Sequence, residues 1–237
     1  ESEKFAVKVS AYNTDWKDRN LTKAVTTGQG DSGDTDVIFL KGIGQKHQGL
    51  EIEGSMKLND MIRLDGAVSF GKWKFDGDAD GLYTEYDEEA PKQTSYTYTL
   101  DGLFVGDQPQ TAYVLGTTLT PMAGLRIQGI FKMYDKNYAD WSPDSRELSG
   151  DADRSQVWQA PAYNRLDLHA AYKLPKIAGY NMTVTGHLFN ALDAVYVQDA
   201  VDNSQYNGFG DKLHLAHNAE VFLGTPRYFN LGLSVNF

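Results

Sequence analysis

The chain has 237 residues, of which 41% are hydrophobic, and it carries a formal net charge of −10 with no cysteine. This acidic balance argues against a nucleic-acid partner, because nucleic-acid-binding surfaces gather Lys and Arg on one face. The missing cysteines exclude a disulfide framework and thiolate metal sites, and no apolar run is long enough for a transmembrane helix.

Apolar and polar residues alternate strictly in five segments, which is the pattern of a strand with one apolar face. In chain order these are residues 50–58, 62–70, 125–133, 166–174 and 228–237. Their apolar faces hold 25 positions without a charge, where the chain's 23% charged residues would place about six by chance. Weaker strand patterns at 5–16, 110–120 and 180–196 bring the expected total to eight.

The connections between these strands alternate in length. Short turns ("NDM", "TPMAG" and "PKIAG") alternate with long loops at 17–44, 76–109, 139–162 and 197–225. A transmembrane β-barrel sorts its connections in this way, with short periplasmic turns and long outer loops. A strand of ten residues tilted by about 45° spans roughly 24 Å, close to the apolar band of such a barrel. A β-sandwich usually has shorter strands.

The pattern therefore favours an all-β fold, an antiparallel outer-membrane β-barrel whose apolar face meets lipid, over a sandwich. Aromatic residues near strand ends would form the interfacial girdles of such a barrel. These are Trp16, Trp73, Phe75, Tyr134, Tyr138, Tyr172 and Phe237.

Several segments resemble the C-terminal barrel region of TonB-dependent outer-membrane receptors, in a style most similar to those of Bacteroides-like bacteria. They include "KGIGQKHQGLEIEGSMKLNDMIRLDGAVSFGKW", "PAYNRLDLHAAYKL" and "HLFNALDAVYVQDA", with the ending "YFNLGLSVNF". The resemblance covers nearly the whole chain. It implies a larger barrel of which residues 1–237 supply about eight C-terminal strands, with the plug and the N-terminal strands absent.

The resemblance also implies the function. We expect active uptake of a scarce ligand, such as a siderophore, glycan, vitamin or peptide, across the outer membrane of a Gram-negative bacterium. The implied partners are outer-membrane lipid, TonB through the absent N-terminal part, and in some members a surface lipoprotein lid. By the same resemblance, the barrel assembly machinery would recognise the terminal strand. The terminal aromatic residue of that assembly signal would be Phe237 in this chain.

Two other functions stay open on the sequence. Eight strands can close a small autonomous barrel that serves as an adhesin or a passive pore. A soluble carbohydrate-binding sandwich is the other, because 14 tyrosines and 4 tryptophans could stack on sugars.

The residues do not form a catalytic constellation, so we do not expect an enzyme. His214 and His217 fall in an expected loop where no helix aligns them, and they read as exposed loop histidines. His169 lies on the polar face of its strand and reads as a wall residue.

The segment "DGDADGLYTEYD" is typical of an oxygen-ligand calcium loop. Asp76, Asp78 and Asp80 alternate, Gly81 takes the sixth position, and Asp87 takes the twelfth, where Glu is usual. The sequence therefore leaves two interpretations of this outer loop, a Ca²⁺ site or a merely acidic loop. It points to no other cofactor.

The final expectation concerns the edges of the sheet. The chain shows no export signal and begins within a strand pattern, which predicts a fragment. We expect the terminal strand to pair with the strand ending near Tyr196, and the first and last strands to leave two open edges. A ladder joining residues 5–16 to 229–237 would instead close an eight-stranded barrel.

Overall fold

The computed structural model describes residues 4–27, 34–86, 90–143, 154–176, 179–203 and 213–236. These residues form antiparallel strands and loops, and none of them belongs to a helix long and apolar enough to cross a membrane.

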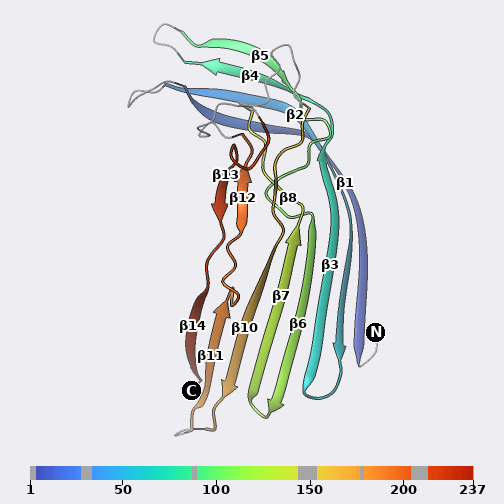
Figure 1. Cartoon of the computed structure of the whole chain (residues 1–237), viewed down its shortest axis with the longest axis vertical. Helices are drawn as coiled ribbons and strands as arrows, with labels where there is room; N and C mark the ends of the chain where they lie inside the picture. The colour runs from blue at the N-terminus through green and yellow to red at the C-terminus, as the bar shows by residue number, and fades with distance from the viewer. Residues whose placement is uncertain are drawn as a thin grey trace.

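Eight long strands stand side by side in the order β14-β11-β10-β7-β6-β3-β2-β1 and form one curved wall (Figure 1). Their bounds are β1 (Phe5–Thr27), β2 (Asp34–Lys57), β3 (Ile62–Phe75), β6 (Thr111–Met122), β7 (Leu125–Asp135), β10 (Tyr163–Lys173), β11 (Asn181–Phe189) and β14 (Tyr228–Asn236). All eight expected strands are present, and the short turns lie together at the end opposite the long connections.

The strand registers place all the apolar faces on one surface of the wall. One row of cross-strand partners consists of Val9, Ile52, Val68, Tyr113 and Met133, and it belongs to what we call the apolar face. A second row consists of Lys57, Arg63, Thr118, Gln128 and His169, and it belongs to the polar face. The alternation read from the sequence is thus continuous across strands.

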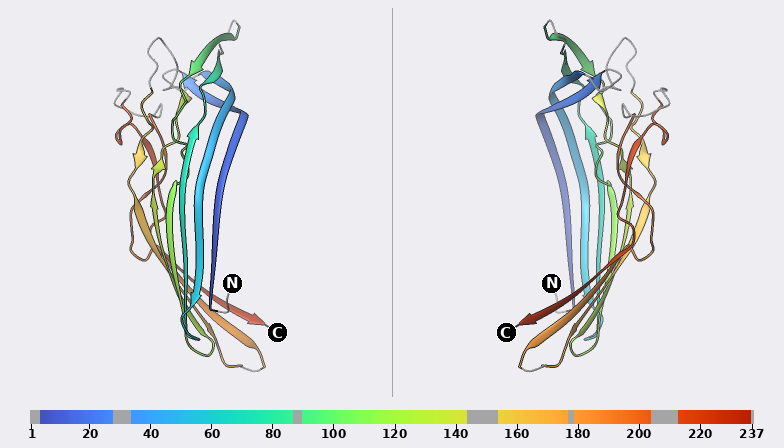
Figure 2. Two further views of the ribbon diagram at one scale, coloured as in Figure 1. Left: turned by 90° about the vertical axis from the view of Figure 1, so that its right-hand side faces the viewer. Right: turned by 90° about the vertical axis from the view of Figure 1, so that its left-hand side faces the viewer.

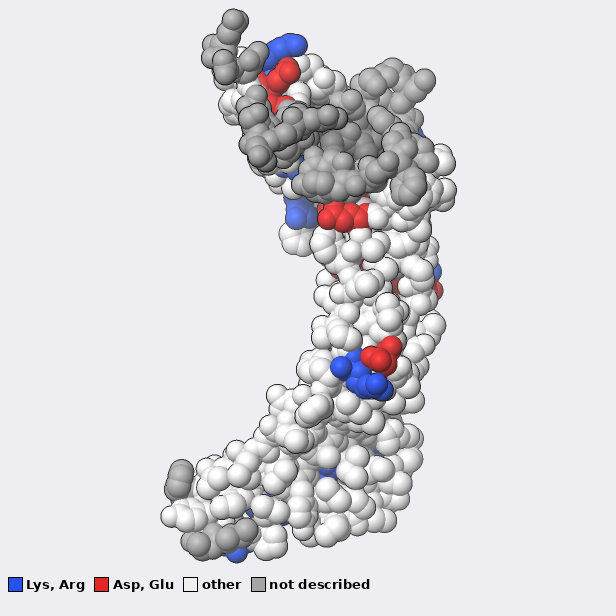
Figure 3. Space-filling model, turned by 60° about the vertical axis from the view of Figure 1, so that its left-hand side comes forward, with Lys and Arg blue, Asp and Glu red and all other residues white. Residues whose placement is uncertain are grey.

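The apolar face is not covered by other parts of the described chain. Phe229 and Leu231 are 73% and 75% exposed, and charged side chains are sparse over the lower part of the face seen in Figure 3. A sandwich would bury such a face against a second sheet. The sandwich reading is therefore wrong, and the surface has the character of a lipid-facing barrel wall.

The wall is open at both sides. Within the described residues β1 pairs only with β2 and β14 pairs only with β11, so the two do not meet. Figure 1 shows β14 and β1 at opposite sides of the sheet, and Figure 2 shows its curvature. The expectation of two open edges is confirmed, and the eight strands do not close a barrel among themselves.

Above the wall, the long connections fold into what we call the outer cap: residues 34–43, 76–86, 90–107, 137–143, 154–160 and 196–203. It contains β4 (Ala79–Glu85) and β5 (Lys92–Tyr98), the short strands β8 (Asn137–Tyr138) and β9 (Gln159–Ala160), and β12 (Val197–Val201), which pairs with β13 (Glu220–Leu223). The upper part of β2 pairs with β4 and carries this layer away from the wall.

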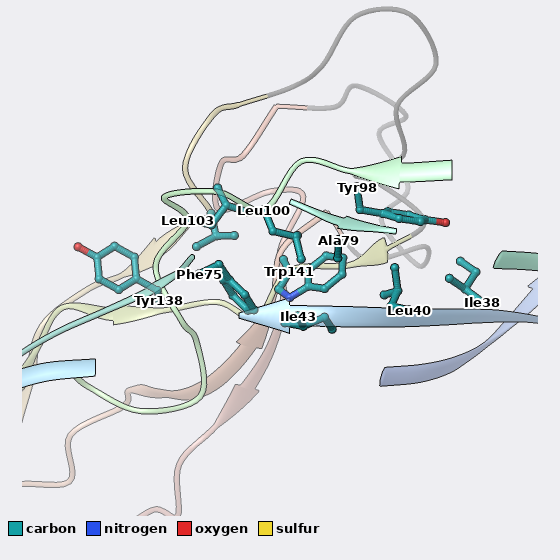
Figure 4. Packing of buried hydrophobic residues seen from close by; sticks show 11 residues of the cluster. Ile38, Leu40, Ile43, Phe75, Ala79, Tyr98, Leu100, Leu103, Tyr138 and Trp141 are labelled. Carbon is teal, nitrogen blue, oxygen red and sulfur yellow. The ribbon is translucent and has the colours of Figure 1, made fainter. Parts of the chain in front are cut away.

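The outer cap has its own hydrophobic core, which Figure 4 shows gathered along β2. Its buried members from the cap are Ile38, Leu40, Ile43, Ala79, Tyr98, Leu100, Leu103, Tyr138, Trp141 and Val157, and Phe75 at the end of β3 joins them. The reading of 17–44 and 76–109 as plain loops is therefore wrong, because apolar side chains scattered through acidic segments bury one another. β1 likewise continues past Trp16 to Thr27.

The strand expected at 180–196 ends earlier than predicted, at Phe189. Asn190 has a positive φ of 48° and is buried. Its side chain accepts a hydrogen bond from the Ala194 amide and donates to the Ala194 carbonyl, which closes a tight turn. This turn separates β11 from β12.

Candidate ligand-binding site

A cavity of about 360 Å³ lies where the polar face of β1–β3 meets the outer cap. Its lining includes Arg19 from β1, Gln45 and His47 from β2, and Asp107, Asp140 and Trp141 from the outer cap. The cavity thus joins side chains from distant segments of the chain, between Arg19 and Trp141, and it carries cationic, amide, aromatic and acidic groups together.

The strand side of the cavity is held by hydrogen bonds between long polar side chains. Arg19 Nη1 donates to Gln45 Oε1 at 2.8 Å, and His47 Nε2 lies 3.2 Å from the same oxygen. The Arg19 guanidinium also lies 5.5 Å from the Trp16 ring centroid, a cation–π contact. These contacts restrict Arg19 to one orientation at the cavity wall.

Aromatic side chains continue this wall along the polar face. His47 stacks on Trp73 with ring centroids 5.3 Å apart, and the Trp73 indole nitrogen donates to the Tyr12 hydroxyl at 2.8 Å. Farther along the same polar face, Tyr134 on β7 contacts Tyr163 on β10, with ring centroids 5.1 Å apart. The polar face near the cavity therefore presents flat aromatic surfaces interleaved with hydrogen-bonding groups, as ligand sites commonly do.

These positions correct the girdle expected from the sequence. Trp16 and Trp73 are register partners of Gln45 and His47 on the polar face, and Tyr134 shares that face with Lys132. Phe75 and Tyr138 are buried in the outer cap, whereas Tyr172 does lie on the apolar face opposite Leu125. Strand parity decides the face, and closeness to a strand end does not.

The cap side of the cavity is acidic, with an exposed Asp107 and a half-buried Asp140. Burial and the neighbouring carboxylate of Asp107 raise the pKa of Asp140 to about 7, against a weaker opposing effect of Lys23. Burial and the charge of Asp199 also raise the pKa of Asp107. The cavity thus places a permanent cation, Arg19, opposite the carboxyl group of Asp140, which exchanges a proton near neutral pH.

The cavity holds no serine, threonine or lysine nucleophile among its described lining residues, and its histidine is engaged with Gln45 and Trp73. What the groups can do is bind a polar ligand through charge, hydrogen bonds and ring contacts.

The aspartates of the calcium-like segment are placed by the structure as follows. Asp78 accepts two hydrogen bonds from Arg154 at 3.1 and 2.9 Å, and two more from the backbone amides of Leu100 and Asp101. The Arg154 hydrogen bonds hold the pKa of Asp78 below its usual range. Asp80 accepts from Thr97 at 3.3 Å.

The calcium site stays a prediction. Asp87 lies outside the described residues, and the described residues alone contain no group of three or more His, Asp or Glu able to hold a metal ion. Ca²⁺ binding would have to displace Arg154 from Asp78. Isothermal titration of the full-length protein with Ca²⁺ tests the site, and no heat in either the wild type or Asp78→Ala would remove it.

The structure bears differently on the other residues that the sequence singled out. Phe237 lies outside the described residues, so its assembly role also stays a prediction. His217 is exposed, whereas the side chain of His214 is buried and ion-paired with Asp202, which corrects its reading as an exposed loop residue. Sequence reasoning missed Arg19, Asp107 and Asp140. Strand parity could have placed His47 and Trp73 on the polar face, but no local signal marks Asp140.

The fold and its two contrasting faces define part of an outer-membrane β-barrel. A family model, "TonB dependent receptor-like, beta-barrel", matches residues 2–191, and the chain belongs to this family. The family is one of outer-membrane receptors of Gram-negative bacteria, which interact with TonB. No curated protein matches the chain.

Proposed function

We propose that this chain supplies part of the wall and outer binding surface of a receptor for active uptake across the outer membrane. The cavity between β1–β3 and the outer cap carries the proposal, because it lies at the end of the wall with the long connections and faces the polar side. A siderophore, glycan, vitamin or peptide would contact Arg19, the aromatic surfaces and the acidic cap there.

The remaining partners follow the same proposal. TonB would act through parts of the receptor beyond these strands and would couple uptake to the proton gradient of the inner membrane. The barrel assembly machinery would recognise the strand that includes β14. Strands from the rest of the receptor would pair with the open edges of β1 and β14, because unpaired backbone groups are costly in lipid.

The proposal is tested by uptake in a Gram-negative host that produces the full-length protein. Cells are given, in turn, a labelled ferric siderophore, cobalamin, an oligosaccharide and a short peptide. We expect accumulation of one of these, and a protonophore should abolish it. Accumulation that continues after the protonophore would contradict active uptake and support a passive pore.

The cavity is tested separately with the ligand that accumulates. Arg19→Gln should weaken its binding at least tenfold, because it removes the charge that faces the cavity. Arg227→Gln is the matched control, since Arg227 is an exposed arginine paired with Asp193 away from the cavity. Equal affinity in Arg19→Gln and the wild type would exclude the cavity as the binding site.

A further inference from the structure

Two histidines face each other across neighbouring strands on the polar face of the wall. His169 on β10 and His187 on β11 are direct register partners, and their Nδ1 atoms lie 2.8 Å apart. One of these nitrogens must carry the hydrogen that joins them, so the two neutral rings have different tautomers. The ring of Phe189 packs against both, with centroid distances of 5.4 Å to His169 and 6.0 Å to His187.

The separation of the two nitrogens matches the geometry of a metal chelate. Imidazole nitrogen binds a first-row divalent metal at about 2.0–2.1 Å, so two nitrogens 2.8 Å apart subtend an angle of about 90° at a shared ion. Adjacent ligands of a tetragonal ion are about 90° apart, whereas tetrahedral zinc prefers about 109°. The spacing therefore suits copper(II) or nickel(II) better than zinc.

The same row of the polar face offers oxygen donors on both sides of the pair. Gln128 on β7 is the register partner of His169, and Asn230 on β14 is the register partner of His187. Gln128 donates its amide nitrogen to Thr118 Oγ1 at 3.3 Å, so its oxygen is the atom left to act as a metal ligand. A cavity of about 400 Å³, lined by Gln128 and both histidines, leaves room for an ion with bound water.

We propose that His169 and His187 form a copper(II) site on the polar wall of the barrel. The ion would replace the proton shared between the two Nδ1 atoms, and amide oxygen or water would complete its coordination. The site goes beyond ligand uptake at the outer cavity, since it is built by β10 and β11 and shares no residue with that cavity.

Two neighbouring positive charges, Lys132 and Arg126, oppose a cation beside His169, and the carboxylate of Asp167 favours one. Arg126 lines the same cavity as the two histidines, and its permanent charge weakens the binding of a divalent ion. Removal of the Arg126 charge should therefore strengthen the binding of the ion. A misfolded protein would bind the ion more weakly, so tighter binding cannot come from misfolding.

The experiment uses the full-length protein, without a polyhistidine tag, in detergent and titrated with Cu²⁺ buffered by glycine. The wild type should bind one more copper ion than His169→Gln/His187→Gln, with an electron paramagnetic resonance signal split by two imidazole nitrogens. Each single variant should bind that ion at least tenfold more weakly, and Arg126→Gln should bind it several-fold more tightly.

His217→Gln is the matched control, because it removes an exposed histidine that is not part of the pair. It should bind copper as the wild type does. Equal copper stoichiometry in the wild type and the double variant, or a spectrum unchanged by the loss of both histidines, would overturn the site.

Discussion

At the scale of single residues, Asp140 shows how the outer cap changes the chemistry of a side chain. Its amide donates to Ala200 O at 2.8 Å, and its carboxylate accepts from the Trp141 amide at 3.1 Å. The carboxyl is thereby held half-buried beside Asp107, and its pKa rises from 3.8 to about 7. Asp140 is therefore a proton-exchanging group at the edge of the cavity.

The raised pKa makes the stability of the outer cap depend on pH. The folded protein keeps a proton on Asp140 that the unfolded chain releases near pH 4, so the cap loses stability as the pH rises from about 4 to about 7. The loss is roughly 4 kcal/mol at most. Asp140→Asn keeps the acceptor oxygen for Trp141 and should remove this dependence.

Hydrogen exchange of the segment 137–143, corrected for the intrinsic exchange rate, measures this effect in the full-length protein. The wild type should be more protected at pH 5 than at pH 8, while Asp140→Asn should show nearly equal protection at both. The same pH slope in the two proteins would contradict a raised pKa at Asp140.

At the scale of elements, a buried carboxylate ties three parts of the wall together. Asp167 on β10 accepts from Lys132 on β7 at 2.9 Å and from the Asn190 amide after β11 at 2.9 Å, and it lies 3.5 Å from Arg165. Asn190 in turn donates to Thr225 O at 3.2 Å, just before β14. The "FNALD" segment thus positions the last strands.

Removing the charge of Asp167 should destabilise the wall strongly. Asp167→Asn leaves Lys132 and Arg165 without their counter-charge in a place where the Asp167 side chain is 3% exposed, and we expect a loss of about 3 kcal/mol. Asp193→Asn, which breaks a half-exposed pair with Arg227, should cost less than about 1 kcal/mol. Urea unfolding in lipid vesicles compares the two, and similar losses would mean that Asp167 does not tie the strands together.

The two faces of β6 provide a second test at this scale. Leu115 lies on the apolar face between Gly66 and Phe131, and its neighbour Val114 lies on the polar face between Ala67 and Lys132. Leu115→Lys should cost about 2–4 kcal/mol in lipid vesicles, because it places a charge in hydrocarbon. Val114→Lys should cost less than about 1 kcal/mol, and a larger loss for Val114→Lys would reverse the assignment of the faces.

At the scale of the whole molecule, the described strands make a wall with two open edges and a folded outer cap. Each edge strand has one partner, β2 for β1 and β11 for β14. The sheet is curved (Figure 2), but the ladder does not join the edges. The open edges are the places where further strands of a larger barrel would pair.

Engineered cysteines test this arrangement, since the chain contains none of its own. Val184→Cys with Leu233→Cys should form a disulfide on mild oxidation of the full-length protein, because the two residues are register partners on β11 and β14. Val7→Cys with Leu231→Cys should stay reduced. A disulfide between the second pair would show that β1 and β14 close the barrel directly.

The strand pattern was the part of the fold that the sequence determined by itself. The faces of the wall strands followed from a period of two, which the backbone imposes locally on each strand. The short turns followed from the spacing of these patterns, and the open edges were expected from the family resemblance and from a chain that begins within a strand pattern. The tertiary structure alone decided the outer cap, because its core joins Leu40, Leu103 and Trp141, whose burial depends on segments far apart in the chain. It likewise decided the cavity of Arg19 and Asp140 and the pairing of His169 with His187. Strand parity shows which face a side chain takes, but cross-strand register and loop packing select its neighbours, and these arise only when distant segments meet.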